Sequence, residues 1–135
     1  RSMAKAMAEF AGLQTHNHVF DLGAGDGSIL LEAKRLQPGI HATGVEIVPL
    51  VWLLGWIRTR TTGIKFLLKD ARKTNVSDAD VIFLYMTPHM LKRMEHVLST
   101  LKKGAKVVSR AFHLPGKTPA EQRNVNGTTL FLYRF

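Results

Sequence analysis

The fold is decided by residues 19–27, which read Val19-Phe20-Asp21-Leu22-Gly23-Ala24-Gly25-Asp26-Gly27. The first four residues form a short apolar stretch typical of a buried strand, and the three alternating glycines predict a tight turn. Residues 28–36 continue as a helix that stops before Pro38-Gly39. A strand, a glycine turn and a helix in this order predict an α/β sheet that binds a ligand at the turn.

Strand-like and helix-like segments alternate along the rest of the chain. Helices are expected over residues 3–13, 28–36, 49–59 and 88–101, and strands over 19–22, 42–47, 64–68, 81–85, 106–109 and 128–135. Residues 111–126 are expected to be a loop with at most one short strand. Alternation implies parallel strands, and the last strand has no clear helix before it, so we predict a mostly parallel sheet with an antiparallel C-terminal edge.

The composition limits the classes of protein and of site. The 135 residues are the size of one domain, so residues 1–135 are expected to form a single domain. The absence of cysteine excludes thiolate ligands and is compatible with a reducing compartment, and we expect no metal site. The net charge of +9 predicts an anionic partner (a nucleic acid, a membrane surface or an acidic protein) or serves only to solubilise the surface.

Carboxylates follow the next two strands at positions where a nucleoside could bind. The turn has glycine at positions 23, 25 and 27, whereas a dinucleotide-binding turn has its third glycine at position 28, so we expect a ligand without a pyrophosphate. Glu46 ends the second strand and could accept the hydroxyls of a ribose. Asp70 follows the third strand and could accept the amino group of adenine, although it could equally be a capping residue. Together the three strand ends predict a nucleoside-shaped groove.

The same residues resemble a known enzyme family. The run from Asp21 to Gly27 resembles motif I of class I S-adenosylmethionine-dependent methyltransferases, Glu46 resembles their ribose-binding position, and Asp70 their adenine-side position. The resemblance spans residues 3–135 and implies an α/β, Rossmann-like sheet of seven strands, with an antiparallel C-terminal edge hairpin. It implies S-adenosylmethionine as cofactor and S-adenosylhomocysteine as product. The implied cofactor-binding residues are Asp21, Gly23, Ala24, Gly25, Asp26, Gly27, Glu46, Ile47, Asp70, Ala71 and Tyr85.

A narrower resemblance concerns the methyl acceptor. Residues 79–88, which read Ala-Asp-Val-Ile-Phe-Leu-Tyr-Met-Thr-Pro, resemble the fourth motif of small archaeal protein-lysine methyltransferases, a subgroup that includes mitochondrial enzymes acting on membrane proteins. Residues 101–112 and 129–133 fit the same subgroup. The resemblance implies a protein lysine as acceptor, in an acidic or membrane-associated substrate. Such proteins carry a lead-in before the first helix that helps to close the cofactor pocket, and we expect residues 1–135 to lack it.

The tip of the fourth strand is where the methyl donor and acceptor are expected to meet. Tyr85, Thr87 and Pro88 lie there and are the expected catalytic residues, with the Tyr85 ring facing a sulfonium or an amine. A packed strand-end aromatic is the equally common alternative for Tyr85. His89 and His113 could accept a proton, although structural roles for them are more common.

Two alternative functions stay open. An RNA methyltransferase is favoured by the basic charge alone, and no aromatic base-stacking motif supports it. A non-catalytic S-adenosylmethionine-binding domain is the second alternative. A dinucleotide oxidoreductase is disfavoured by the glycine spacing.

Residues 50–57 hold more apolar side chains than one sheet-covering stripe needs. The run is far shorter than the roughly 20 residues of a membrane span, so no transmembrane span is expected. The excess indicates contact with another subunit, a hydrophobic substrate or a membrane surface, with ordinary core packing as the alternative. The sequence does not fix the oligomeric state.

Overall fold

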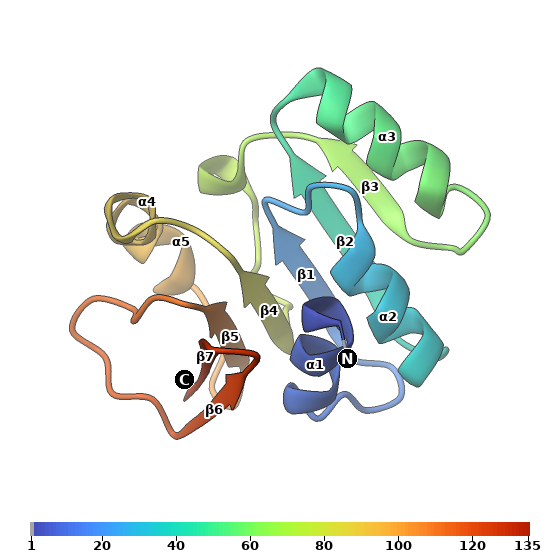
Figure 1. The fold of residues 1–135 in the computed structure, drawn as a ribbon. Helices are drawn as coiled ribbons and strands as arrows, with labels where there is room; N and C mark the ends of the chain where they lie inside the picture. Colours follow the sequence, from blue (N-terminus) through green and yellow to red (C-terminus); the bar gives the residue numbers. More distant parts are fainter. Residues whose placement is uncertain (1) are drawn as a thin grey trace.

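The structure is a computed structural model that describes residues 2–135 (Figure 1). The helices are α1 (Met3–Phe10), α2 (Ser28–Leu36), α3 (Pro49–Thr59), the short 3-10 helix η1 (Ala71–Lys73), α4 (Pro88–Arg93) and α5 (Glu95–Leu98). The strands are β1 (His18–Leu22), β2 (His41–Glu46), β3 (Lys65–Leu68), β4 (Val81–Leu84), β5 (Lys106–Arg110), β6 (Glu121–Val125) and β7 (Thr128–Arg134).

All seven strands belong to one sheet, in the order β3-β2-β1-β4-β5-β7-β6. The pairs from β3 across to β5 are parallel, whereas β7 runs antiparallel to both β5 and β6. The predicted mostly parallel sheet with an antiparallel C-terminal edge hairpin is therefore confirmed. The chain builds outward from β1 through β2 to β3 and then returns to start β4 on the other side of β1. This reversal creates a crevice at the carboxyl ends of β1 and β4, where such sheets bind ligands.

Helices cover both faces of the sheet (Figure 1). Alternate residues of each buried strand point to opposite faces. Val19 of β1 therefore packs in the cluster beneath α1 and α2, and Leu22 in the cluster beneath α4 and α5. Each cluster is continuous along several strands, so the sheet is buried on both sides as the apolar β4 sequence predicts.

The helix expected over residues 3–13 ends at Phe10, and two other segments differ more from the sequence expectation. The helix expected over residues 88–101 breaks at Met94, where Met94 and Val97 donate tight i→i+3 bonds to the carbonyls of Leu91 and Met94. The short strand allowed within residues 111–126 is β6, joined to β7 by Asn126-Gly127, both at positive φ. An Asn-Gly pair between two strands is a strong signal for a two-residue hairpin, and it defines the C-terminal edge here.

Candidate functional site

The glycine turn after β1 uses its three glycines for two different purposes. All three have positive φ, at +86° for Gly23, +56° for Gly25 and +82° for Gly27, where other residues are strained. A Cβ added to Gly25 would meet no atom within 4 Å, and one on Gly23 would meet only Met86 Cε at 3.9 Å. A Cβ on Gly27 would come within 2.8 Å of Thr59 Cγ2. Gly23 and Gly25 thus leave open space at the end of β1, whereas Gly27 lets α3 pack closely.

The backbone amides of the turn donate to the protein itself. The amides of Gly23 and Ala24 both donate to the carbonyl of Val45, at 2.9 and 2.8 Å. The Gly25 amide donates to Glu46 Oε1 at 2.9 Å. The turn is therefore fixed against the end of β2, and its amides are not the free donors that the start of a helix would otherwise offer to a carboxylate.

Glu46 is held in place by three backbone amides. Its Oε1 accepts from Gly25, and its Oε2 accepts from Ile47 and Val48, both at 3.1 Å. A carboxylate has about four lone-pair sites, so roughly one remains for a ligand. Glu46 can thus accept one ribose hydroxyl as it stands, and accepting both hydroxyls would require one amide to move.

The three predicted strand ends open into one cavity. A cavity of about 260 Å³ lies at the carboxyl ends of β1, β2 and β3 and against α4. From the predicted set it is lined by Gly23, Glu46, Ile47, Asp70 and Ala71. The other lining residues are Val45, Lys69, Arg72, Met86, Met90 and Arg93. The last three follow β4 and were missed, since only the fold brings α4 beside the ends of β2 and β3.

Asp70 lines this cavity and also caps a helix. Its Oδ1 accepts from the Arg72 amide at 2.9 Å at the start of η1, and its Oδ2 accepts from Arg72 Nη2 at 2.8 Å. Hydrogen bonds from Arg72 and its charge lower the pKa of Asp70 below the usual range. Asp70 is therefore a fixed carboxylate in the cavity wall, and the cap that the sequence left as an alternative is also present.

Asp21 places a buried carboxyl group beside the turn. Its side chain is 2% exposed, and its Oδ2 has no hydrogen-bond partner within residues 2–135. Burial, together with the nearby carboxylates of Glu46 and Asp26, raises the pKa of Asp21 to about 7. The end of β1 thus holds a buried carboxyl group whose ionised form a nearby positive charge would favour.

Asp26 has a different environment. Arg58 Nη1 lies 2.8 Å from Asp26 Oδ2, and Asp26 Oδ1 accepts from the amide and hydroxyl of Ser28 at 3.0 and 2.6 Å. Burial alone would raise the pKa of Asp26, but the bonds from Ser28 and the charge of Arg58 outweigh it and lower that pKa. Asp26 does not line the cavity and instead connects the start of α2 to α3.

The three expected catalytic residues also lie outside the cavity wall. Tyr85 is 53% exposed at the tip of β4, with the guanidinium of Arg110 at 4.1 Å from its ring centroid. Thr87 Oγ1 accepts from the Met90 amide at 3.3 Å and caps α4, and Pro88 is the first residue of that helix. All three residues are exposed, and Thr87 and Pro88 also start α4. Arg110 comes from the end of β5, and no sequence pattern singled it out.

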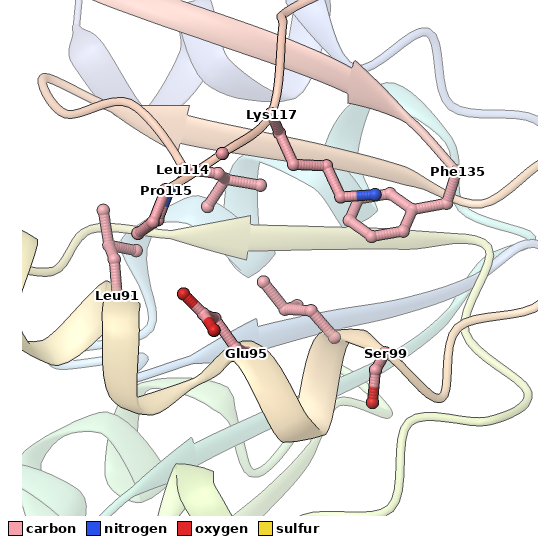
Figure 2. Close-up of a pocket in the computed structure, with 9 residues that line it drawn as sticks. Leu91, Glu95, Ser99, Leu114, Pro115, Lys117 and Phe135 are labelled. Carbon is pink, nitrogen blue, oxygen red and sulfur yellow. The ribbon is translucent and has the colours of Figure 1, made fainter.

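A larger cavity, of about 500 Å³, lies on the other side of α4 (Figure 2). Leu91 and Glu95 line it from one side, and Leu114, Pro115 and Lys117 from the other. Figure 2 shows the Lys117 side chain running toward Phe135, where its Nζ lies 4.0 Å from the ring centroid. This cavity contains no residue from the ends of β1, β2 or β3. The cavity that joins the predicted strand ends is therefore the smaller one.

The residues in and beside the smaller cavity fit an adenosyl-sulfonium compound. The Cβ position of Gly25, next to the cavity, is open, so a ligand can lie directly on the backbone there. Glu46 and Asp70 offer carboxylate oxygens that can accept hydrogen bonds from hydroxyl and amino groups of a nucleoside. They share the cavity wall with the basic side chains of Lys69, Arg72 and Arg93, so the fit rests on placed acceptors and not on net charge.

Comparisons with known proteins agree with this geometry. A model of the ANTKMT methyltransferase domain matches residues 21–121. The protein-lysine N-methyltransferase of Saccharolobus islandicus (strain REY15A) is 28% identical over 141 residues, which cover 97% of this chain and 87% of the relative. A lysine N-methyltransferase of Caenorhabditis elegans, named for a component of ATP synthase, is 23% identical over 118 residues, and the match covers 84% of this chain and 61% of that protein.

A solved structure extends the likeness to three dimensions. The RNA methyltransferase from Salinibacter ruber, in complex with S-adenosyl-L-homocysteine, superposes with a TM-score of 0.90 and 26% identity, covering 97% of this chain and 88% of the other. The family match runs from Asp21 near the end of β1 to Glu121 at the start of β6 and includes every residue of the smaller cavity. This chain therefore belongs to the ANTKMT methyltransferase domain family, within the class I S-adenosylmethionine-dependent methyltransferases.

Proposed function

We propose that the protein methylates the side-chain amine of a protein lysine, with S-adenosylmethionine as the donor. The observation that carries methyl transfer is the opening of three strand ends into one cavity beside the tip of β4. The choice of lysine is supported by the two relatives, both named as lysine methyltransferases. We also propose that residues 1–135 act as one domain.

The cofactor-binding roles follow from the position of each carboxylate. Glu46 accepts a ribose hydroxyl on its remaining lone pair, and Asp70 accepts a hydrogen bond from the adenine end. Gly23, Ala24 and Gly25 present backbone to the ligand, while Gly27 and Asp26 hold the turn against α3. Ile47 and Ala71 supply apolar contacts. The bound cofactor supplies a sulfonium methyl group that needs no further activation.

The acceptor side is built around Tyr85. The ring is half-exposed beside the crevice, and its hydroxyl can accept a hydrogen bond from an amine. The guanidinium of Arg110 lies against this ring, and a nearby positive charge lowers the pKa of an approaching lysine amine and so favours its neutral form. The amine lone pair then forms the new nitrogen–carbon bond as the carbon–sulfur bond breaks, and the product ammonium releases one proton. Alignment of the two groups provides most of the catalysis.

RNA is the second candidate acceptor. The similarity to the Salinibacter ruber RNA methyltransferase and the net charge of +9 favour it. The tip of β4 has Tyr85, Met86 and Thr87, without the Asn or Asp that often precedes the proline in enzymes that methylate base nitrogens. This residue choice favours the lysine acceptor.

A labelling experiment separates the candidates. The protein is incubated with methyl-labelled S-adenosylmethionine and a cell extract, and the products are digested with protease or with ribonuclease. We expect protease-sensitive label that appears as methyl-lysine after acid hydrolysis. Label that survives protease and is released by ribonuclease would establish the RNA candidate. Cofactor binding with no label in either fraction would establish a non-catalytic binding domain.

The cofactor site is tested with Glu46→Ala. Loss of a charged hydrogen-bond acceptor should weaken S-adenosylmethionine binding about 10-fold or more in a calorimetric titration. The control is Glu121→Ala, which removes an exposed carboxylate at the far edge of the sheet and should leave affinity unchanged. Equal affinity of the two variants would show that Glu46 does not contact the cofactor.

A further inference from the structure

The outer face of α3 is apolar. Leu50, Leu53, Leu54 and Ile57 follow helical spacing on one face and are 72%, 41%, 59% and 48% exposed. The opposite face carries Gly55 and buries it against the sheet. A sheet-covering helix ordinarily turns its large apolar residues toward the sheet. Helix α3 shows an inversion of this pattern, because four large apolar residues face outward and the small Gly55 faces the sheet.

This inversion is fixed by close packing on the inner side. A Cβ on Gly55 would lie 2.4 Å from Phe66 Cζ and 2.8 Å from the carbonyl oxygen of Gly25. Helix α3 therefore lies directly on the backbone of the glycine turn and on the Phe66 ring. No larger side chain of α3 fits there, so the leucines cannot rotate inward without moving the helix.

Exposed apolar side chains concentrate around this helix. Seven of the eleven exposed large hydrophobic residues of the described chain fall within residues 47–57. We call this surface the α3 apolar patch. It is made by Ile47, Val48, Leu50, Leu53, Leu54 and Ile57. Single exposed leucines are common on soluble domains, but a contiguous group of this size marks a contact surface.

The charged side chains within the α3 segment are all basic, although Arg58 is paired with Asp26 and Glu46 adjoins Ile47. Between residues 47 and 69 the chain has no Asp or Glu, and its charged residues are Arg58, Arg60, Lys65 and Lys69. Arg60 lies at the C-terminal end of α3, with its guanidinium 5.8 Å from the Trp56 ring centroid. An exposed apolar face with cations at its border provides the two contributions on which interfacial binding depends, apolar burial and attraction to acidic lipids.

We propose that the α3 apolar patch binds the surface of an anionic lipid bilayer. The leucines would enter the boundary between headgroups and acyl chains, and the basic residues would contact acidic headgroups. The contact is peripheral, because no helix of residues 2–135 has the length and apolar character to cross a membrane. A second copy of this chain is a poorer occupant, since its own net charge of +9 would bring like charges together.

The contact would also place the reaction near the lipid. Ile47 is 57% exposed in the α3 apolar patch and also lines the cofactor cavity. A bilayer bound to the patch therefore lies beside the cavity, and lysines near a membrane surface would be presented to it. Membrane binding itself does not depend on methyl transfer, so it can fail or succeed independently of the proposed function.

The test is sedimentation of the protein with vesicles of phosphatidylcholine alone or with about a third phosphatidylglycerol, a share that gives a strongly anionic surface. We expect binding to the anionic vesicles, weakened when salt is raised because screening shortens the reach of surface charges. The double variant Leu50→Gln/Leu54→Gln should lower the partition coefficient about 10-fold or more. Leu36→Gln is the matched control, since Leu36 is 42% exposed on α2 and lies outside the patch.

A second pair of variants tests the contribution of the basic residues to vesicle binding. Arg60→Gln/Lys65→Gln should weaken binding to anionic vesicles, whereas Lys92→Gln/Lys103→Gln removes two exposed charges elsewhere and should weaken it much less. The substituted positions are exposed, so circular dichroism should show unchanged melting. The proposal is overturned if the protein does not bind anionic vesicles, if the leucine variant and Leu36→Gln bind equally, or if the leucine variant abolishes only a dimer.

Discussion

At the scale of single residues, Asp21 has the most unusual charge state. Its carboxyl group is buried at the end of β1 and its pKa is raised to about 7, so the folded protein holds this proton more tightly than the unfolded chain, where the pKa is 3.8. The stabilisation from proton binding is complete below pH 3.8 and is lost as the pH rises through 7. Above that pH the protein keeps a charge buried beside Glu46 and Asp26.

We therefore expect Asp21→Asn to stabilise the ligand-free protein at alkaline pH. The gain should be near zero around pH 4, grow up to pH 7 and level off above it at a few kcal/mol in order of magnitude. Urea unfolding at several pH values measures this. The same variant is expected to bind S-adenosylmethionine more weakly if the cationic ligand gains from a carboxylate buried beside the glycine turn, as the proposed site requires. A gain in stability that does not change with pH would show that Asp21 is not protonated in the folded protein.

Residue positions were predicted better than residue contacts. The sequence indicated that Glu46 and Asp70 end neighbouring strands, and both line one cavity. The sequence did not indicate that Glu46 accepts three amides. The bond from Gly25, 21 positions away, depends on the fold, and the bonds from Ile47 and Val48 are local but have no residue pattern that announces them. Arg110 was missed for a similar reason, since its contact with Tyr85 depends on the pairing of β4 with β5.

At the scale of elements, the glycine turn and α3 form one packed unit. Gly27→Ala combines a positive φ with a Cβ that would lie only 2.8 Å from Thr59 Cγ2. It should lower the free energy of unfolding by more than the roughly 1–2 kcal/mol that a strained φ alone costs. Adding Thr59→Ser should recover part of the loss, since serine removes the methyl group but keeps the hydroxyl that donates to the Gly55 carbonyl.

Gly25→Ala is the contrasting variant. Its Cβ would meet no protein atom, so only the strain of a positive φ should appear in a thermal melt. The added methyl group would occupy the space proposed for the ligand, and S-adenosylmethionine affinity should fall. If Gly27→Ala and Gly25→Ala lose equal stability, or if Gly25→Ala binds normally, the division of roles within the turn is wrong.

Element boundaries were predictable where local signals are strong. Glycine or proline marks the ends of α2 and the start of α3, and both helices match their predicted ranges, Ser28–Leu36 and Pro49–Thr59. The break at Met94 has no glycine or proline to announce it. The strand β6 was left as an option, although Asn126-Gly127 is a hairpin signal, because Glu121–Val125 lacks the apolar alternation of a half-buried strand.

At the scale of the whole molecule, the alternation of strands and helices predicted a mostly parallel sheet, because strands separated by helices are joined by right-handed crossovers. The seven strands and the antiparallel edge hairpin were implied by the family resemblance, and the strand order was not predicted. The cavity shape did not follow, since Met90 and Arg93 reach it only through the packing of α4. The net charge of +9 follows directly from the sequence, and it is expected to raise the rate of association with acidic substrates.

We expect salt to slow the methylation of acidic substrates selectively. Raising sodium chloride from about 0.05 to about 0.5 M should lower kcat/KM several-fold for a lysine peptide flanked by Asp and Glu, because screening weakens long-range attraction. A peptide of the same length with neutral flanks should change little. Equal salt dependence for both peptides would mean that the net charge does not steer the substrate.

The contact of Gly55 with the turn has a mechanical consequence. Since no side chain separates α3 from the Gly25 carbonyl, and the Phe66 ring fills the remaining space, a push on the outer surface of this helix reaches the glycine turn through rigid backbone. Protein interiors of this density transmit strain with little compression. A macromolecule that presses on the leucines is therefore expected to shift the glycine turn together with α3.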